Sequence, residues 1–332
     1  MTSKTSRLGA DLGSTELTGV IEQRLDAIEA QLLKQCHSDV PLIDDMTTHL
    51  VKAGGKRFRP LITVLSATLG DVHKPEIVKA AVVVELTHLA TLYHDDVMDE
   101  ATMRRGAVSV NQRFSNSQAI LAGDFLFARA SELVADLGPE AVRLQAQTFE
   151  RLVTGQLLET AGPKADEDPV EFHLKVLAEK TGSLIATSAQ FGAEFSGASK
   201  SDVLAMRKFG ELIGVTFQLA DDIIDMSSTE VELGKQRGND LLEGVPTLTT
   251  LLVRRNDRPE DQELMKFLIG PVSSVDLIKV LDLISLNPAI NQAKEIAQDW
   301  ANKARTSIQG ITNKETLKVL EQLCDAVILR SA

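Results

Sequence analysis

Apolar residues recur at spacings of three and four along most of the chain, for example in residues 17–33, 76–97 and 119–137. This spacing puts apolar side chains on one face of an α-helix, which can then pack against a core. The pattern continues in residues 141–160, 171–195, 203–226, 275–286, 291–309 and 315–330. Almost no segment alternates with the period of two that is typical of a strand. The predicted fold class is therefore all-α.

Short segments rich in glycine, proline, serine and charged residues separate the periodic segments and indicate loops. They lie at residues 52–60, 161–169, 196–202, 227–240 and 253–262. None of them is long or biased enough to be an interdomain linker, and no repeat of 20 to 50 residues is present. We therefore expect a single-domain helical bundle over residues 16–332, preceded by a disordered N-terminus at residues 1–15.

Composition narrows the classes of protein that fit. The chain has 332 residues, of which 43% are hydrophobic, and a net charge of −12. This charge argues against nucleic acid or an acidic membrane surface as the main partner and allows at most peripheral membrane contact. Cys36 and Cys324 are too far apart in sequence to indicate a disulfide framework or a zinc site. The N-terminus has no secretory signal and no run of about 18 uninterrupted apolar residues occurs, so we expect a cytoplasmic protein.

The segment HDDVMDE, residues 94–100, concentrates acidic side chains after a mostly apolar, uncharged run. On a helix, Asp95 and Asp99 lie on one face, with Asp96 about a hundred degrees round. Like charges at this spacing repel, so the arrangement requires a compensating cation. Hard oxygen ligands without a nearby thiolate favour Mg²⁺. Taken alone, the segment is equally well explained as a solvated acidic helix end.

A second copy of the same spacing makes coincidence a poor explanation. It lies in FQLADDIIDM, where Asp221, Asp222 and Asp225 follow another apolar helix. Two acidic helix faces that met across a cavity would hold several Mg²⁺ ions, which a diphosphate requires to become a leaving group. Local positive charge is also present, at Lys56, Arg57, Arg59, Arg104, Arg105 and Lys180. A nucleotide site is excluded on spacing, because GxxxxGK[ST] and GxGxxG are both absent.

With these motifs the chain resembles the trans-isoprenyl diphosphate synthases, also called polyprenyl synthetases. The resemblance covers about residues 40–250 and rests on GGKRFRP, HLATLYHDDVMDEATMRRG, LAGDFLF, TGQLLE, EKTGSL and FQLADDIIDM with GKQRGNDLLEG, in the family's order. It implies the isoprenoid synthase fold around a deep central cavity, usually as a homodimer. It also implies condensation of isopentenyl diphosphate with an allylic diphosphate, using two or three Mg²⁺ ions per active site.

The resemblance assigns roles to individual residues. Metal binding falls to Asp95, Asp96 and Asp99 in the first motif and to Asp221, Asp222 and Asp225 in the second. Isopentenyl diphosphate is expected on Lys56, Arg59, His88 and Arg105, and the allylic diphosphate or its cation on Arg104, Lys180, Thr181, Gln218 and Lys235. The catalytic set is Asp95, Asp99, Arg104, Lys180 and Asp221. Val245 stands where family members often carry a lysine, which puts one diphosphate contact in doubt.

His88 has two interpretations. A lone histidine in an apolar helix is more often a core group than a ligand. Its position seven residues before Asp95 nevertheless puts both side chains on one helix face, so His88 is expected to donate to a diphosphate.

In this family the growing tail runs along the helix before the first motif, where large side chains act as a floor. Here the positions are small: Ala80, Val84, Thr87, Ala90 and Thr91. The helix rises roughly 16 Å from Ala80 to Thr91, and an isoprene unit covers about 4 to 5 Å. We therefore expect a product of six or more isoprene units, for a quinone side chain. The alternative is that small residues only permit tight helix packing, with Phe125, Phe127 or a partner subunit closing the tunnel, which would give a shorter, farnesyl or geranylgeranyl product.

Two further functions remain open. A class I terpene cyclase uses the same ionisation but handles one diphosphate, so the additional basic cluster argues against it. A regulatory subunit of a heteromeric synthase is expected to have lost part of an aspartate motif, and both motifs are intact here.

Overall fold

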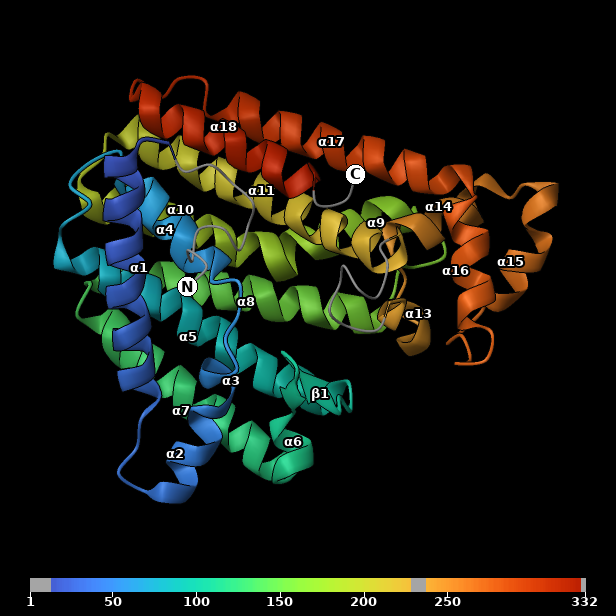
Figure 1. Cartoon of the computed structure of the whole chain (residues 1–332), viewed down its shortest axis with the longest axis horizontal. Coiled ribbons are helices and arrows are strands. Elements are labelled where there is room, and N and C mark those ends of the chain that lie inside the picture. The colour runs from blue at the N-terminus through green and yellow to red at the C-terminus, as the bar shows by residue number, and fades with distance from the viewer. Residues whose placement is uncertain (1–12, 228–236, 330–332) are drawn as a thin grey trace. The chain divides into compact units, whose positions relative to one another are not determined.

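The computed structural model describes residues 13–227 and 237–329 (Figure 1). Helices form almost all of this described chain, and its strands are limited to one short antiparallel hairpin. The predicted all-α fold class is therefore confirmed. Residues 1–12 of the predicted disordered N-terminus lie outside the described residues, and Ser14 caps the first helix by accepting a hydrogen bond from the Leu17 backbone N–H.

The described helices and strands follow one another in a simple order along the chain. The first half of the chain contains α1 (Thr15–Cys36), α2 (Pro41–Thr47), α3 (His49–Lys52), α4 (Phe58–Ala67), α5 (Pro75–Met98), β1 (Met103–Arg104), β2 (Ala107–Val108), α6 (Val110–Arg113), α7 (Asn116–Ala135) and α8 (Pro139–Ala161). The second half contains α9 (Pro169–Leu177), the π-helix η2 (Ala178–Gly182), α10 (Ser183–Ser196), α11 (Lys200–Ser227), α13 (Asn239–Glu243), α14 (Leu248–Asn256), the 3-10 helix η3 (Pro259–Asp261), α15 (Gln262–Phe267), α16 (Leu277–Ser285), α17 (Pro288–Ser307) and α18 (Lys314–Leu329).

The described residues divide into two compact units. The first unit comprises residues 13–150, 184–210 and 307–320, and the second comprises the remaining described residues, 151–183, 211–227, 237–306 and 321–329. The division falls within helices α8, α11 and α18 rather than in a linker. The expectation of one domain over residues 16–332 stays a prediction.

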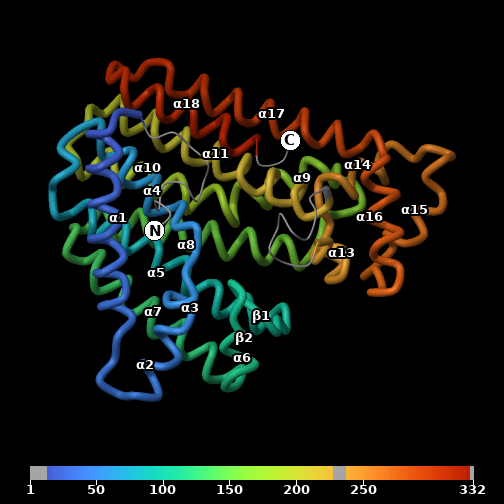
Figure 2. Tube along the Cα trace, viewed as in Figure 1, coloured from blue at the N-terminus to red at the C-terminus, as the bar shows by residue number. Residues whose placement is uncertain are grey.

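Helix α5 is the central element of the first unit. It contacts α1, α4, α6 and α7, and the tube in Figure 2 shows its path among them. Most of its residues are buried, from Ile77 near its start to Asp96 in its last turn. Pro75 occupies the first turn, where the missing N–H leaves no hydrogen bond unmade. A helix enclosed on several sides is mostly apolar all round, which explains the uncharged run at residues 86–93.

Within the described residues, α5 is also the one helix long and apolar enough by composition to cross a membrane. However, 72% of its most apolar window is buried inside the protein, as in the core helix of a globular domain. This observation is therefore weak support for a membrane span.

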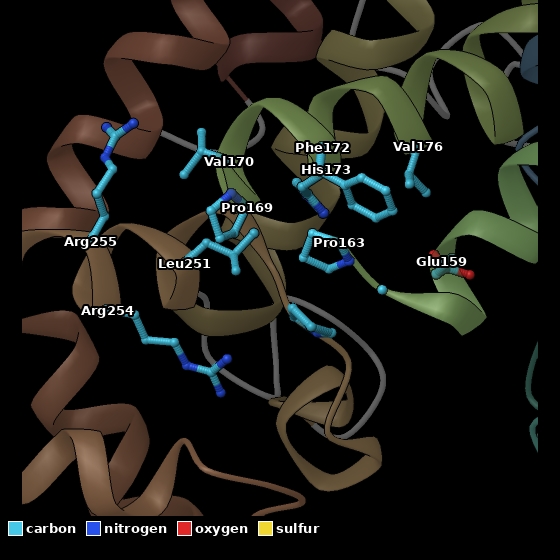
Figure 3. A pocket seen from close by; sticks show the side chains of 12 residues that line it. Glu159, Pro163, Pro169, Val170, Phe172, His173, Val176, Leu251, Arg254 and Arg255 are labelled. Atoms are coloured by element: carbon cyan, nitrogen blue, oxygen red, sulfur yellow. The ribbon is translucent and has the colours of Figure 1, made fainter. Parts of the chain in front are cut away.

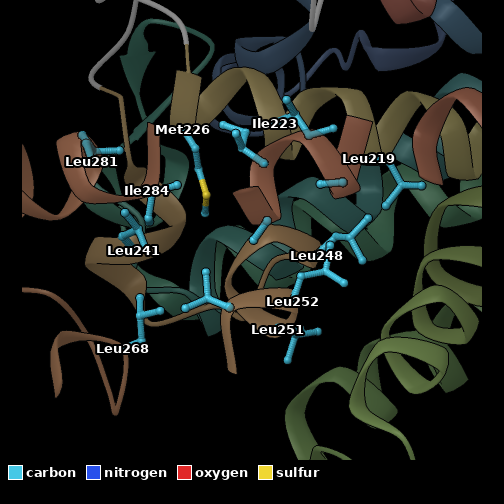
Figure 4. Close-up of a cluster of buried hydrophobic side chains, with 14 of the residues drawn as sticks. Leu219, Ile223, Met226, Leu241, Leu248, Leu251, Leu252, Leu268, Leu281 and Ile284 are labelled. Carbon is cyan, nitrogen blue, oxygen red and sulfur yellow. The ribbon is translucent and has the colours of Figure 1, made fainter. Parts of the chain in front are cut away.

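The second unit has its own hydrophobic core (Figure 4). Leu219, Ile223 and Met226 of α11 pack there with Leu248 and Leu252 of α14. Helices α9, α13, α15, α16 and α17 contribute the other apolar side chains. Because this core holds the end of α11, it fixes the backbone that carries the second aspartate motif.

Close contact between helix backbones in the first unit depends on glycine. A Cβ atom at Gly192 of α10 would overlap the carbonyl oxygen of Thr63 in α4. Both groups are backbone or directly attached to it, so rotation of a side chain cannot relieve the overlap. By contrast, Gly19 of α1 has open space around it.

We expect Gly192→Ala to lower the free energy of unfolding by about 1–3 kcal/mol or more, because α10 and α4 must separate. The matched control Gly19→Ala adds the same methyl group on an exposed helix surface and is expected to raise it by about 0.5–1 kcal/mol. Urea unfolding of both variants measures these changes. Equal stability of the two variants would contradict the packing that the structure shows.

Candidate active site

The first aspartate motif lies in the last turn of α5 and divides into two environments. Asp95 is partly buried and Asp99, which caps the helix, is exposed. Asp96 is fully buried, and its Oδ1 accepts a hydrogen bond of 2.5 Å from Arg104 Nε. Burial raises the pKa of Asp96, although the charge of Arg104 acts in the opposite direction. Asp99 is therefore accessible at the end of the helix, Asp95 lies one turn before it, and Asp96 binds the arginine that follows the motif.

The carboxylates fit a magnesium ion that keeps water and substrate oxygens in its shell. Among the described residues, no cluster of three or more acidic, histidine or cysteine side chains forms a complete metal cage. Mg²⁺ typically takes only one or two protein carboxylates and uses phosphate and water for the remaining positions. In addition, Oδ2 of Asp96 is buried and accepts no hydrogen bond from the described protein. A pair of carboxylates one turn apart, with a buried third beside it, is consistent with this mode of binding.

The hairpin of β1 and β2 directs two consecutive arginines to different places. Arg104 contacts the aspartates, with its Nη2 atom 3.9 Å from Asp99 Oδ2. Arg105 adopts a left-handed backbone conformation (φ 54°) in the turn, which rotates its side chain away. Its Nη1 atom donates to the carbonyl oxygens of Leu50 at 3.1 Å and Gly54 at 2.5 Å. The two arginines of the segment RRG thus bind different groups: Arg104 contacts the aspartates, and Arg105 binds backbone carbonyl oxygens.

The structure brings together three arginines, which we call the arginine cluster: Arg57, Arg59 and Arg105. Arg57 and Arg105 lie beside Glu85 of α5, whose side chain is 2% exposed, and Arg59 is close enough for the charge of Glu85 to act on it. Arg57 Nη1 lies 3.1 Å from Glu85 Oε1, and Arg105 Nη2 lies 3.9 Å from the same oxygen. Arg57 also binds Glu29 through two hydrogen bonds of 2.8 Å. The sequence pattern grouped Arg57 with the phosphate-binding cations, but the structure places it between two carboxylates.

The positive charges of the other two members, Arg59 and Arg105, are only partly compensated. Burial lowers the pKa of Arg59 to about 10, and Glu85 counteracts this only in part. Arg59 Nε is buried and makes no hydrogen bond within the described protein. Burial and the neighbouring arginines also hold the pKa of Arg105 below its usual value. Buried cations with incomplete compensation form a site that favours an anion. Lys56 lies at the exposed edge of the same loop.

His88 is one turn of α5 beyond Glu85 and shares its electrostatic environment. Desolvation, followed by the charges of Arg59 and Arg105, holds the pKa of His88 well below its ordinary value of 6.5. The imidazole is therefore neutral at physiological pH and is able to donate one N–H without adding charge.

The second aspartate motif lies at the end of α11, in the second unit. Asp222 is buried, and its Oδ1 accepts a 3.0 Å hydrogen bond from Gln218 Nε2. Its Oδ2 lies 3.7 Å from His173 Nε2 of α9. Asp225 is also buried and accepts from the backbone N–H of Asp240 at 3.4 Å, while Asp221 is partly exposed. In each motif a buried aspartate is held by a neighbouring side chain, Asp96 by Arg104 and Asp222 by Gln218.

Lys180 and Thr181 lie in the π-helix η2, between α9 and α10. Lys180 Nζ is 2.5 Å from Glu159 Oε2 of α8. A Cβ atom at Gly155 would lie 2.5 Å from the backbone nitrogen of Lys180, so this glycine allows α8 to approach the π-helix. Single π-turns are costly and occur often at functional sites, because they displace side chains from the regular helical positions.

A pocket of about 340 Å³ lies in the second unit beside these residues (Figure 3). Its wall is mostly apolar, with Pro163, Phe172, Val176 and Leu251 among the lining residues. Glu159 and His173 line it as well. The pocket is therefore lined both by Glu159, which binds Lys180, and by His173, which lies beside Asp222.

Sequence reasoning missed Glu85, Glu159 and His173. The signal for Glu85 was present, since it is the one acidic residue between Glu76 and the first motif. His173 had no such signal, because Glu171 and Lys175 flank it in sequence, whereas Glu159 lies in the segment TGQLLE that supports the resemblance. Lys235 lies outside the described residues. Val245 is 37% exposed, and its backbone N–H donates to the Asp240 carbonyl oxygen at 2.8 Å.

The residues predicted to set chain length are buried in the first unit. Val84, Thr87 and Ala90 are at most 1% exposed, and Thr91 is 8% exposed. Gln145 Nε2 of α8 donates to Thr87 Oγ1 at 3.2 Å. Gly123 of α7 packs against the backbone carbonyl of Ala90. Ala90 thus lies at a tight helix contact, whereas Thr87 faces a longer polar side chain. The open tunnel stays a prediction.

Comparisons with solved structures identify the fold. A polyprenyl synthase from Caulobacter crescentus CB15, complexed with calcium and isoprenyl diphosphate, has a TM-score of 0.86 at 32% identity and covers 97% of this chain and 99% of its own. Geranylgeranyl pyrophosphate synthase from Corynebacterium glutamicum, in a complex of the same kind, has a TM-score of 0.85 at 40% identity, with the same coverage. The described chain therefore has the all-α isoprenoid synthase fold.

The family follows from the sequence matches. The polyprenyl synthetase family model matches residues 40–283. Nonaprenyl diphosphate synthase from Mycobacterium tuberculosis (strain ATCC 25618 / H37Rv) is 42% identical over 326 residues, which is 97% of each chain. This chain belongs to the polyprenyl synthetase family, and the resemblance inferred from its motifs is confirmed.

The lowered pKa of His88 predicts a pH dependence of stability. Below pH 6.5 the unfolded chain takes up a proton at His88 that the folded protein does not bind, so the free energy of unfolding falls as pH decreases. We expect His88→Gln to reduce this fall by about 1 kcal/mol between pH 6.5 and 5.5. Urea unfolding of both proteins at the two pH values measures the difference. An unchanged difference would show that His88 is accessible to protons in the folded state.

Proposed function

We propose that the protein is a trans-polyprenyl diphosphate synthase that condenses isopentenyl diphosphate with an allylic diphosphate. The observation that carries this proposal is the arginine cluster around Glu85, which forms an anion site separate from the arginine and lysine that accompany the aspartates. An enzyme that joins two diphosphates requires two such sites. Membership of the polyprenyl synthetase family supports the same reaction.

Each group of residues has a distinct task in this reaction. Arg59, Arg105, Lys56 and neutral His88 bind and orient isopentenyl diphosphate, with Arg105 fixed by backbone carbonyls. Arg104 and Lys180 contact the allylic diphosphate, and carboxylates of the protein hold both side chains. Asp95, Asp96 and Asp99 of the first motif and Asp221, Asp222 and Asp225 of the second would hold two or three Mg²⁺ ions.

When bound, Mg²⁺ neutralises the departing pyrophosphate. The chain itself stabilises the allylic cation with dipoles and excludes water from it. We assign the first task to Gln218 and Thr181, and the hydrogen bond from Gln218 to Asp222 orients the Gln218 amide. No side-chain base is assigned, because the released pyrophosphate is able to take the final proton.

A long product, of six or more isoprene units, is supported by the small side chains at Val84, Thr87, Ala90 and Thr91. The similarity to nonaprenyl diphosphate synthase agrees with it. The alternative, a shorter product, draws support from the similar fold of a geranylgeranyl pyrophosphate synthase and from the contact of Gln145 with Thr87.

We further propose a cytoplasmic homodimer that touches membranes at most peripherally and supplies a quinone side chain. Exposed apolar side chains on α7 support self-association, since Ile120 is 42% and Leu121 is 64% exposed. Two further candidates, a terpene cyclase and a regulatory subunit, differ in what they need. A cyclase turns over without isopentenyl diphosphate, and a regulatory subunit is inactive by itself.

Purified protein with farnesyl diphosphate, isopentenyl diphosphate and Mg²⁺ is expected to form longer prenyl diphosphates. Asp95→Ala should reduce this rate by about 10³-fold or more, because a metal-binding carboxylate is lost. The control Asp299→Ala removes an exposed carboxylate from α17 and should leave the rate within about twofold. Product formation is followed by chromatography, with and without isopentenyl diphosphate. Full activity of Asp95→Ala would overturn the metal assignment.

Product length tests the tunnel. Thr87→Phe inserts a large ring at a buried position one helix turn from Ala90 and is expected to stop elongation at four units or fewer. Thr87→Ser keeps the hydroxyl group that Gln145 contacts and serves as the control. Chromatographic sizing of the products compares both with the unsubstituted protein. A full-length product from Thr87→Phe would show that the tail does not pass this position.

A further inference from the structure

Glu85 is a carboxylate buried at the centre of a site that must bind a more highly charged anion. Its side chain is 2% exposed, and a single oxygen, Oε1, approaches both Arg57 and Arg105. Its charge also acts on Arg59 and opposes the effect of burial on that residue's pKa. Glu85 therefore touches or influences every member of the arginine cluster.

The contacts indicate that Glu85 contributes mainly negative charge to the arginine cluster. Other groups already hold the arginines in place. Arg105 is already held by the carbonyl oxygens of Leu50 and Gly54. Arg57 is already held by Glu29 and by the carbonyl oxygens of Gly54 and Val51. Three guanidinium groups buried together repel one another, and Glu85 offsets this repulsion in the absence of substrate. With Glu29, it leaves one positive charge of the cluster unbalanced.

This balance of charge affects how the chain grows, provided that the proposed function holds. In each round the allylic C1–O bond breaks, and pyrophosphate leaves with its electron pair. A new C–C bond forms to the isopentenyl double bond, and one proton is lost to the released pyrophosphate. The product keeps the diphosphate of the isopentenyl unit. Before the next round, that diphosphate must leave the arginine cluster and reach the aspartates, where it becomes the leaving group. A cluster that bound it too tightly would stop growth.

We propose that Glu85 is a resident counter-charge that weakens diphosphate binding to the arginine cluster so that each elongated product is released for the next round. Glu85 and the diphosphate compete for the same guanidinium groups. When the product leaves, the carboxylate again compensates the charge of the guanidinium groups. This compensation keeps the arginine cluster folded and limits its affinity for a diphosphate.

Isothermal titration calorimetry measures the Kd of isopentenyl diphosphate for the unsubstituted protein and for Glu85→Gln, without Mg²⁺ or allylic substrate. Glu85→Gln keeps the shape and removes the charge, so we expect Kd to fall by about tenfold. A role in positioning alone predicts the opposite sign, because looser arginines bind less well. Under turnover, Glu85→Gln is expected to form the first condensation product at the normal single-turnover rate and to add later units several-fold more slowly.

Two control variants separate charge from packing. Glu29→Gln removes a carboxylate that binds Arg57, and the side chain of Glu29 is 37% exposed. Its Kd should stay within about threefold of the unsubstituted protein. Glu85→Asp keeps the charge and should also stay within about threefold. Unchanged or weaker binding by Glu85→Gln would overturn the proposal.

Stability of Glu85→Gln provides a second measurement. The variant is expected to have a lower Tm without ligand and a larger rise in Tm when isopentenyl diphosphate is added. If it folds only with that ligand present, the ligand has replaced the missing charge, as the proposal requires. If it stays unfolded both with and without the ligand, Glu85 is a structural residue and the proposal is wrong. If instead the unsubstituted protein forms no condensation product, the proposed function fails, which is a separate result.

Discussion

Burial of charged groups along α5 is the constraint on which the rest of the first unit depends. The helix is enclosed by its neighbours, yet it carries Glu85, His88 and the first aspartate motif. A buried charge is tolerated only when a counter-charge lies beside it. The loop before α4 and the hairpin after α5 supply these counter-charges: Arg57 reaches Glu85, and Arg104 reaches Asp96. The folded protein has therefore already assembled much of the positive charge that a diphosphate requires.

The second unit solves the same problem with weaker partners. Asp222 is held by an amide and an imidazole, Gln218 and His173, rather than by an arginine. Lys180 is held by Glu159 and sits in a π-helix that glycine at position 155 allows α8 to approach. Each unit thus restrains a buried carboxylate of its own aspartate motif through a neighbouring side chain. Restrained side chains lose little entropy when ligand binds, which favours precise placement of the reacting groups.

Helix packing connects this electrostatic design with product length. Small residues on α5 serve two purposes, since Ala90 allows α7 to approach at Gly123 while Thr87 meets Gln145 of α8. A small side chain in a sequence does not reveal whether the space beside it holds a substrate tail or a neighbouring helix. The pattern of small residues upstream of the first motif therefore bears on chain length only through the helices that pack there.

The sequence alone determined the fold class and the chemistry of the motifs. Apolar spacing of three and four predicted helices because that period is a local property of the backbone, and two DDxxD segments indicated metal and diphosphate because the carboxylates of each are neighbours on one helix. The tertiary structure decided the roles of residues whose partners are distant in sequence. Arg57 and Arg59 are two positions apart, yet one is bound by Glu29 and Glu85 while the other keeps an unpartnered buried Nε. Burial and counter-charge arise only when segments far apart in the chain meet, so no local pattern of residues 52–60 could separate the two arginines.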